Sequence, residues 1–315
     1  MKLRSPHYDW QRYNFGTISL CMIMRDDAKV LARCLSSVVG LVDEIIIVDT
    51  GSTDNSIDIA LSFGAKILQD PWQDDFSRPR NLGLEHARGN YIFILDPDEL
   101  ILPVHHNDVR WLTRAKNVDA FWITTLNYGA HDKEPDYRLL QHGSDPLGLY
   151  RGYTPSTKTR FFKNGLGIRF EGCYHELVDY YLVRKKIKIG MATFPIHHWA
   201  HEFSQASVQA KKDFYLRLGE KKVREWPSHS QAHWELAVTE MIYGYRERAS
   251  RSIARAIRLG FDTNKQFFAL ARCQYYLHNI DKATFAFEKG ICMLYPALTH
   301  IDPTLRPLAP LLNDL

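Results

Sequence analysis

Apolar runs alternate with amphipathic segments along the first hundred residues of the chain. The run TISLCMIM begins at Thr17, apolar residues at helical spacing follow it, and a second apolar run, EIIIVDT, comes next. This order predicts a strand, a helix and another strand. The rhythm continues with a helix over 54–63, a strand over 65–69, a helix over 80–87 and a strand over 91–95. Apolar strands separated by helices favour an α/β fold with a mostly parallel sheet flanked by helices.

Acidic residues follow two of these predicted strands at the point where each strand ends. Asp49 follows EIIIV, and Asp96 follows YIFIL. Because ligands of open α/β sheets bind at the carboxyl ends of the strands, we expect both side chains at a ligand site. Asp96 and Asp98 also form a DxD motif within LDPDE, and carboxylates at this spacing can reach one hard divalent cation. A helix cap or an Asp-Pro turn is the structural alternative for so short a motif.

The pattern changes twice after residue 100. Residues 119–200 contain the apolar runs AFWITTL, TRFFK and IKIG between long polar stretches, which predicts strands joined by loops. After residue 202 the chain is predicted to be helical throughout, and similar residues recur at an offset of 34, as Ala237 and Ala271 do. This spacing resembles the tetratricopeptide repeat, although an ordinary pair of helical hairpins fits equally well. We therefore predict an extension over 1–16, a sheet domain over 17–200, a connecting helix over 201–226 and a helical-repeat domain over 227–315.

Composition narrows the class of protein. Of the 315 residues, 45% are hydrophobic and 24% are charged, which is typical of a folded globular protein. The formal net charge of +4 is too small a surplus to require nucleic acid as a partner. The sequence has neither the apolar centre of a secretory signal nor the run of about 20 apolar residues that a membrane helix needs, so a cytoplasmic location is expected. The five cysteines are scattered without a CxxC pair, which indicates reduced thiols.

Common nucleotide-binding and hydrolase motifs are missing from the sequence. It contains no P-loop GxxxxGK[ST], no GxGxxG after the first strand and no GxSxG elbow. It contains instead EIIIVDTGSTDNS, in which a Gly-containing turn gives a ligand room to approach and Asp49 can accept hydrogen bonds from a nucleoside. In SRPRNLGLEHARGNY, Arg78 and Arg80 lie at a predicted helix start, where positive charge suits a diphosphate.

These segments, in this order, resemble the family 2 glycosyltransferases of GT-A fold. The resemblance covers about residues 17–100 and rests on CMIMRDDAKVLARCLSSV, DEIIIVDTGSTDNSIDIA and DFSRPRNLGLEHARGNYIFILDPDE. It points to the bacterial subgroup that includes lipopolysaccharide-core glucosyltransferases and peptide S-glycosyltransferases. The resemblance implies a metal-dependent, inverting transfer of a sugar from a nucleotide-diphosphate sugar, with a UDP-sugar as the expected donor, to a glycan or a protein or peptide acceptor.

The resemblance also implies roles for individual residues. It predicts a donor nucleotide site formed by Asp27, Asp49, Gly51, Ser52, Arg80 and Asp96. It predicts that Mn²⁺ or Mg²⁺ is held by Asp98, Asp96 and His198, because GT-A enzymes complete the metal site with a histidine just after the last core strand. Where the family commonly has Asn-Glu, this chain has Asp26-Asp27. Glu176, in RFEGCYHELV, is the expected base that deprotonates the acceptor, with His175 as the alternative.

Two other interpretations are compatible with the sequence. The acceptor could be modified nucleic acid, as the slightly basic charge balance and aromatic residues such as Trp199 and Tyr215 suggest. The chain could also be a binding or scaffold protein of tetratricopeptide type with a vestigial transferase site, although the complete set of donor-site acids argues against this. The sequence defines neither the sugar nor the oligomeric state.

Overall fold

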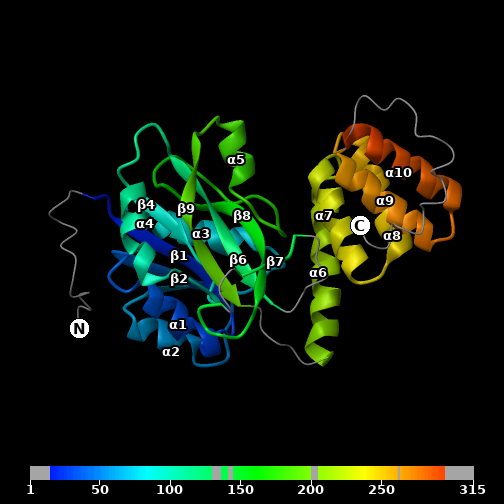
Figure 1. Cartoon of the computed structure of the whole chain (residues 1–315). Coiled ribbons are helices and arrows are strands. Elements are labelled where there is room, and N and C mark those ends of the chain that lie inside the picture. Colours follow the sequence, from blue (N-terminus) through cyan, green and yellow to red (C-terminus); the bar gives the residue numbers. More distant parts are fainter. Residues whose placement is uncertain (1–14, 130–135, 141–144, 200–204, 262, 295–315) are drawn as a thin grey trace. The chain divides into compact units, whose positions relative to one another are not determined.

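The computed structural model describes residues 15–129, 136–140, 145–199, 205–261 and 263–294. The chain divides between residues 202 and 203 into two compact units. The N-terminal unit is a sheet covered by helices, and the C-terminal unit is a set of packed helices (Figure 1). This confirms the predicted fold class, an α/β sheet flanked by helices and followed by an all-α region.

The first half of the sheet is parallel. Its elements are β1 (Ile18–Met24), α1 (Ala28–Val38), β2 (Glu44–Asp49), α2 (Ser56–Ser62), β3 (Lys66–Gln69), α3 (Ser77–His86) and β4 (Tyr91–Ile94). The strands lie in the order β3-β2-β1-β4. Leu20 and Met22 of β1 pack in the cluster that contains α1, whereas Cys21 packs in the cluster that contains Leu84 of α3. Both faces of β1 are therefore buried, which is why its sequence is apolar throughout.

The second half of the sheet is mixed. Its elements are β5 (Glu99–Leu100), η2 (Pro103–His105), α4 (His106–Leu112), β6 (Ala120–Tyr128), β7 (Arg138–Leu139), β8 (Gly152–Lys163), α5 (Asp179–Arg184) and β9 (Ile189–Trp199). The sheet continues from β4 in the order β8-β6-β9-β5, with β7 paired to β8. β8 runs antiparallel to both β4 and β6, while β6 and β9 are parallel. The short strand β5 pairs with the end of β9, which places Glu99 opposite His198.

Several element boundaries differ from those predicted, two of them for reasons that the contacts show. Helix α3 begins at Ser77 rather than near residue 80, because Oδ1 of Asp75 accepts the backbone N–H of Ser77 at 2.8 Å and supplies a partner for the first turn. The strand predicted at IKIG extends through the polar residues His197 and His198 to Trp199, because β9 lies between β6 and β5 and pairs with both.

The C-terminal unit repeats its helices at one interval. It consists of α6 (Gln205–Glu225), α7 (Ser230–Ile242), α8 (Arg246–Arg258), α9 (Asn264–Tyr276) and α10 (Ile280–Leu294). Helices α9 and α10 begin 34 residues after α7 and α8, respectively. Ala237, Ala249, Ala271 and Ala283 are fully buried where these helices meet. None of the described helices is long and apolar enough to cross a membrane.

Candidate active site

Asp49 closes the turn that follows β2. Its carboxylate accepts the backbone N–H of Gly51 at 3.2 Å and that of Ser52 at 3.1 Å, and the side chain is buried. Gly51 has a φ of +113°, a conformation that only glycine adopts without strain. The three predicted donor-site residues of this turn are therefore held together by their own hydrogen bonds, at the carboxyl end of a parallel strand.

The loop after β1 is tied to the turn after β2. Asp26 has a φ of 54°, and its Oδ1 accepts the backbone N–H of Thr53 at 2.7 Å. The backbone N–H of Asp27 donates to Oγ of Ser56 at 2.8 Å. Burial raises the pKa of the Asp27 carboxyl to about 6, and the nearby negative charges add to this although the backbone N–H of Arg25 opposes it. Asp98 is one of the charges that raise this pKa, so Asp27 lies within electrostatic reach of the DxD motif.

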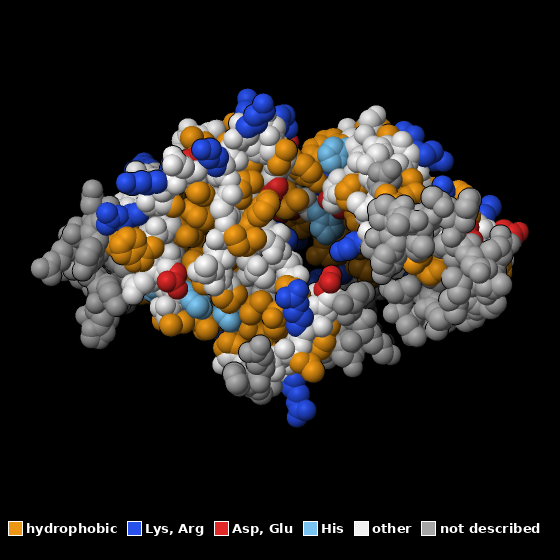
Figure 2. Space-filling model, turned by 45° about the horizontal axis from the view of Figure 1, so that its top comes forward, with side chains coloured by type: hydrophobic (Ala, Val, Ile, Leu, Met, Phe, Trp, Pro, Cys, Tyr) orange, Lys and Arg blue, Asp and Glu red, His pale blue; other side chains and the backbone are white. Residues whose placement is uncertain are grey.

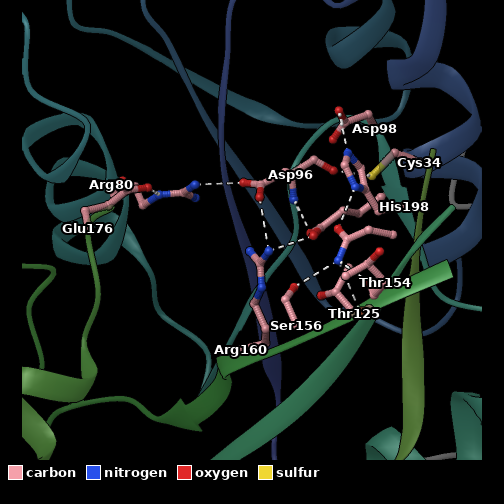
Figure 3. Close-up of polar contacts among 12 residues, drawn as sticks. Cys34, Arg80, Asp96, Asp98, Thr125, Thr154, Ser156, Arg160, Glu176 and His198 are labelled. Atoms are coloured by element: carbon pink, nitrogen blue, oxygen red, sulfur yellow. Dashed lines mark hydrogen bonds and ion pairs between the residues drawn. The ribbon is translucent and has the colours of Figure 1, made fainter. Parts of the chain in front are cut away.

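The first aspartate of the DxD motif, Asp96, forms a connected network with two arginines (Figure 3). Asp96 accepts from Nη2 of Arg80 at 2.8 Å through Oδ1 and from Nη2 of Arg160 at 3.1 Å through Oδ2. Arg160 also donates to Oε1 of Glu99 at 2.6 Å, and Glu99 accepts the backbone N–H of Asp96 at 2.9 Å. Burial alone would raise the pKa of Asp96, but the charges of Arg80 and Arg160 outweigh burial and hold this pKa below its usual range.

Arg80 connects the DxD motif to the predicted base. Its Nε donates to Oε1 of Glu176 at 2.6 Å, while its Nη2 holds Asp96, and its guanidinium lies 5.3 Å from the ring centre of Phe170. Glu176 is mostly buried within this arrangement. His175, the alternative base, is exposed and has a φ of 46°. The structure therefore brings Glu176, rather than His175, into the polar network.

His198 lies beside Asp98 because β5 and β9 pair. Its Nε2 lies 3.2 Å from Oδ2 of Asp98, and its Nδ1 lies 2.9 Å from Oδ1 of Asn127. Burial would lower the pKa of His198, but the Asp98 carboxylate outweighs burial and raises it. The preceding residue, His197, is buried against the hydroxyl of Tyr128 instead, and burial lowers its pKa to about 4. His201, the third histidine of the sequence FPIHHWAHEF, lies outside the described residues.

The residues around the DxD motif fit a divalent cation that also binds a diphosphate. Asp98 and His198 direct one oxygen and one nitrogen at each other, whereas both oxygens of Asp96 face arginines. Within the described part of the chain, no group of three or more His, Cys, Asp or Glu side chains is arranged to hold a metal ion. Mg²⁺ is commonly bound by one or two carboxylates together with substrate phosphates, so the Asp98 carboxylate fits this kind of site, with the imidazole of His198 beside it.

A pocket opens beside Arg80, and its walls include residues that the sequence did not indicate. It is lined by Arg80, Asp96, Lys158, Thr159, Arg160, Phe170 and Glu176, among others. Arg160 was missed although its context contains a signal. It interrupts the apolar strand TRFFK, and a charged residue inside a buried strand requires a charged partner. No such signal marks Asn127, which the strand pairing places between Thr154 of β8 and His198 of β9.

Comparison with known proteins shows which family the sheet unit resembles. Residues 19–162 match the model of the family described as glycosyl transferase family 2. Over 162 residues the chain is 38% identical to a TPR repeat-containing protein of Synechococcus elongatus, covering 51% of this chain and 35% of that protein. It is 23% identical over 231 residues to the SPbeta prophage-derived glycosyltransferase SunS of Bacillus subtilis, covering 73% of this chain and 50% of SunS. The chain thus spans half or less of the length of these curated relatives.

A solved structure gives a weaker match. The crystal structure of S. aureus TarS 1-349 in complex with UDP-GlcNAc aligns with 91% of this chain and 94% of that chain, at 14% identity and a TM-score of 0.49. This likeness is too low to transfer a ligand from one protein to the other. The family match covers β1 to β8 and includes the DxD motif, Arg80 and Arg160. Residues 19–162 are therefore similar to glycosyl transferase family 2, and a helical region follows them in the chain.

Proposed function

We propose that the chain is a metal-dependent glycosyltransferase that moves a sugar from a nucleotide-diphosphate sugar to an acceptor. One observation carries the proposal. In a sheet unit similar to glycosyl transferase family 2, Arg80, Asp96 and Glu176 form one network at the strand ends, and Asp98 and His198 meet immediately beside it. A UDP-sugar is the expected donor, and a glycan or a protein or peptide is the expected acceptor.

The donor would bind across the ends of β1, β2 and β4. The tied loops that contain Asp27 and Asp49 supply carboxylates for the nucleoside, at the edge of the sheet where α/β proteins bind ligands. Asp98 and His198 would hold Mn²⁺ or Mg²⁺, which supplies charge neutralisation for the leaving diphosphate. Asp96 contributes by fixing Arg80 and Arg160 beside this position, so its negative charge is already balanced by protein side chains.

Glu176 would act as the base. The ion pair with Arg80 fixes the direction of the Glu176 side chain, and a carboxylate can take the proton of an attacking hydroxyl, thiol or amine. The base and the DxD motif are held by the same guanidinium, so the nucleophile and the leaving group would be aligned by one side chain. Inversion at the anomeric carbon in a single displacement is what the family resemblance implies.

The helical unit would present the acceptor. Its 34-residue interval and its buried alanines support repeats of tetratricopeptide type, and a TPR repeat-containing relative supports the same assignment. On the face seen in Figure 2, Lys and Arg side chains are scattered among other residues rather than gathered in one patch, so this face gives no support for modified nucleic acid as the acceptor. We propose a protein, peptide or glycan acceptor in the cytoplasm.

The test is a screen of nucleotide sugars by thermal shift, with and without Mn²⁺, followed by assays of donor hydrolysis and transfer. A donor that binds only the native state raises the melting temperature. We expect Asp98→Asn to abolish the Mn²⁺-dependent shift and transfer while the protein stays folded, and Asp58→Asn, which alters an exposed carboxylate on α2, to change neither. An active Asp98→Asn variant would refute the metal role, and a chain that binds no nucleotide sugar would favour the scaffold interpretation.

A further inference from the structure

Asn127 lies on the central strand of the mixed half of the sheet. In the strand register it is opposite Thr154 of β8 on one side and opposite His198 of β9 on the other. Its side chain bonds to both neighbouring strands, since Nδ2 contacts β8 and Oδ1 contacts His198. One amide therefore links the strand that carries Arg160 to the strand that carries the predicted metal-binding histidine.

The hydrogen bonds to β8 fix which end of the amide faces His198. Nδ2 of Asn127 donates to the carbonyl oxygen of Thr154 at 2.8 Å and to Oγ of Ser156 at 3.1 Å. A backbone carbonyl can only accept, so turning the amide over would place two acceptor oxygens against each other at Thr154. The position of Oδ1, 2.9 Å from Nδ1 of His198, thus follows from the partners on β8 and not from the histidine.

An acceptor at this position determines where the imidazole carries its proton. Because Oδ1 of an amide has no hydrogen to give, the hydrogen between Asn127 and His198 belongs to Nδ1 of the histidine. A neutral imidazole has a single N–H, so its other nitrogen, Nε2, then has a free lone pair. Nε2 faces Oδ2 of Asp98 at 3.2 Å, and this carboxylate favours a second proton on Nε2 until a divalent ion takes the place of that proton.

We propose that Asn127 is a positioning residue that holds His198 as the Nδ1–H tautomer and directs the Nε2 lone pair at the divalent ion beside Asp98. This inference rests on the proposed metal-dependent function. The Nδ1 hydrogen bond also fixes the plane of the ring, because a ring flip about χ2 would lose Asn127 as a partner. Partners of this kind typically change metal affinity about 10-fold to 100-fold when they are removed.

The first test measures Mn²⁺ binding directly, by calorimetry or by the loss of the free-ion EPR signal. Asn127→Leu removes the acceptor at similar volume, and we expect it to weaken Mn²⁺ binding about 10-fold to 100-fold. The matched control is Thr124→Val, which removes a cross-strand hydrogen bond to Thr157 on the same pair of strands without touching His198. Unchanged affinity in Asn127→Leu would overturn the proposal.

The second test reads the protons of the imidazole directly. Long-range ¹H–¹⁵N spectra of ¹⁵N-histidine-labelled protein, with His198 assigned by its absence in His198→Gln, report which ring nitrogen is protonated. We expect Nδ1 to be protonated with and without Mg²⁺ and the proton on Nε2 to be lost when Mg²⁺ binds, and Asn127→Leu to need a higher Mg²⁺ concentration for that loss. An unprotonated Nδ1 in the unaltered protein would overturn the proposal. A chain that binds no Mn²⁺ but shows the Nδ1–H ring would contradict the proposed metal dependence and leave the tautomer assignment standing.

Discussion

Replacing Asp27 by Asn should stabilise the ligand-free protein while weakening its donor site. Burial raises the pKa of this carboxyl from 3.8 to about 6, so the folded state at neutral pH holds an ionised group in an unfavourable environment. Each unit of pKa shift corresponds to about 1.4 kcal/mol, and a shift of about two units therefore costs up to about 3 kcal/mol of folding free energy. Since the side chain is only partly buried, we expect a gain of about 1–3 kcal/mol in the Asp27→Asn variant.

The pH dependence of this gain follows from the sign of the shift. An acid with a raised folded-state pKa binds more protons in the folded state than in the unfolded state between pH 4 and pH 6. Stability from this group is therefore full below the unfolded-state pKa and is lost as the pH rises through the folded-state pKa. The Asp27→Asn variant lacks this loss and can still accept the backbone N–H of Arg25, so its advantage should be present at pH 7.5 and disappear near pH 4.

Denaturant and thermal unfolding of both proteins at the two pH values measures the effect. A gain of 1 kcal/mol raises the melting temperature of a domain of this size by about 2–4 °C. Asp58→Asn, at an exposed carboxylate, is the control and should show no pH-dependent gain. An Asp27→Asn variant that is less stable than the original at pH 7.5, or whose advantage persists unchanged at pH 4, would refute the reasoning. In the original protein, Mn²⁺ with a nucleotide should remove part of the cost, because added positive charge favours the carboxylate.

Three further substitutions and one control test the site. Arg160→Met should destabilise the protein by about 3–5 kcal/mol in denaturant unfolding, because it removes the guanidinium that pairs with the buried Glu99 and leaves Asp96 with Arg80 alone of its two arginines; a loss well below 1 kcal/mol would contradict this account. Gly51→Ala and Gly64→Ala should each lower the free energy of unfolding by about 1–2 kcal/mol, because both positions have a positive φ. Only Gly51→Ala should also weaken nucleotide binding in a titration, since the turn that contains Gly51 holds Asp49. Glu176→Gln should lower the transfer rate by about 10²–10⁴-fold with donor binding retained, and an unaltered rate would exclude Glu176 as the base.

The parallel half of the fold could be predicted from the sequence because its information is local. Each apolar run ends in a turn with its own polar residues, so the alternation of strand and helix is visible within short windows. The mixed half depends on pairing between distant segments. The register that places Asn127 between Thr154 and His198 involves residues 27 and 71 positions away, and no short pattern encodes it.

In the candidate site, too, local sequence patterns predicted some residues, while others depend on contacts between distant segments. The positions of Asp49 at the end of β2 and Asp96 just after β4 follow from the strand pattern, whereas Glu176 and His198 were predicted only through the family resemblance. What the sequence did not reveal is how Asp96 is used. Its two oxygens are bound by Arg80 and Arg160, and the second of these arginines lies 64 residues away on an antiparallel strand. A DxD motif indicates that carboxylates are present, but the neighbouring strands determine which of them faces a ligand.

The pairing of β5 with β9 has a consequence for how the protein becomes active during synthesis. His198 lies 100 residues after Asp98, and Glu176 also comes after residue 162, where the family match ends. With the roles proposed above, a nascent chain that has emerged only as far as residue 162 would still lack His198 and Glu176. Pairing of β9 with β5 would then be the step that brings His198 to Asp98 and completes the proposed ion site.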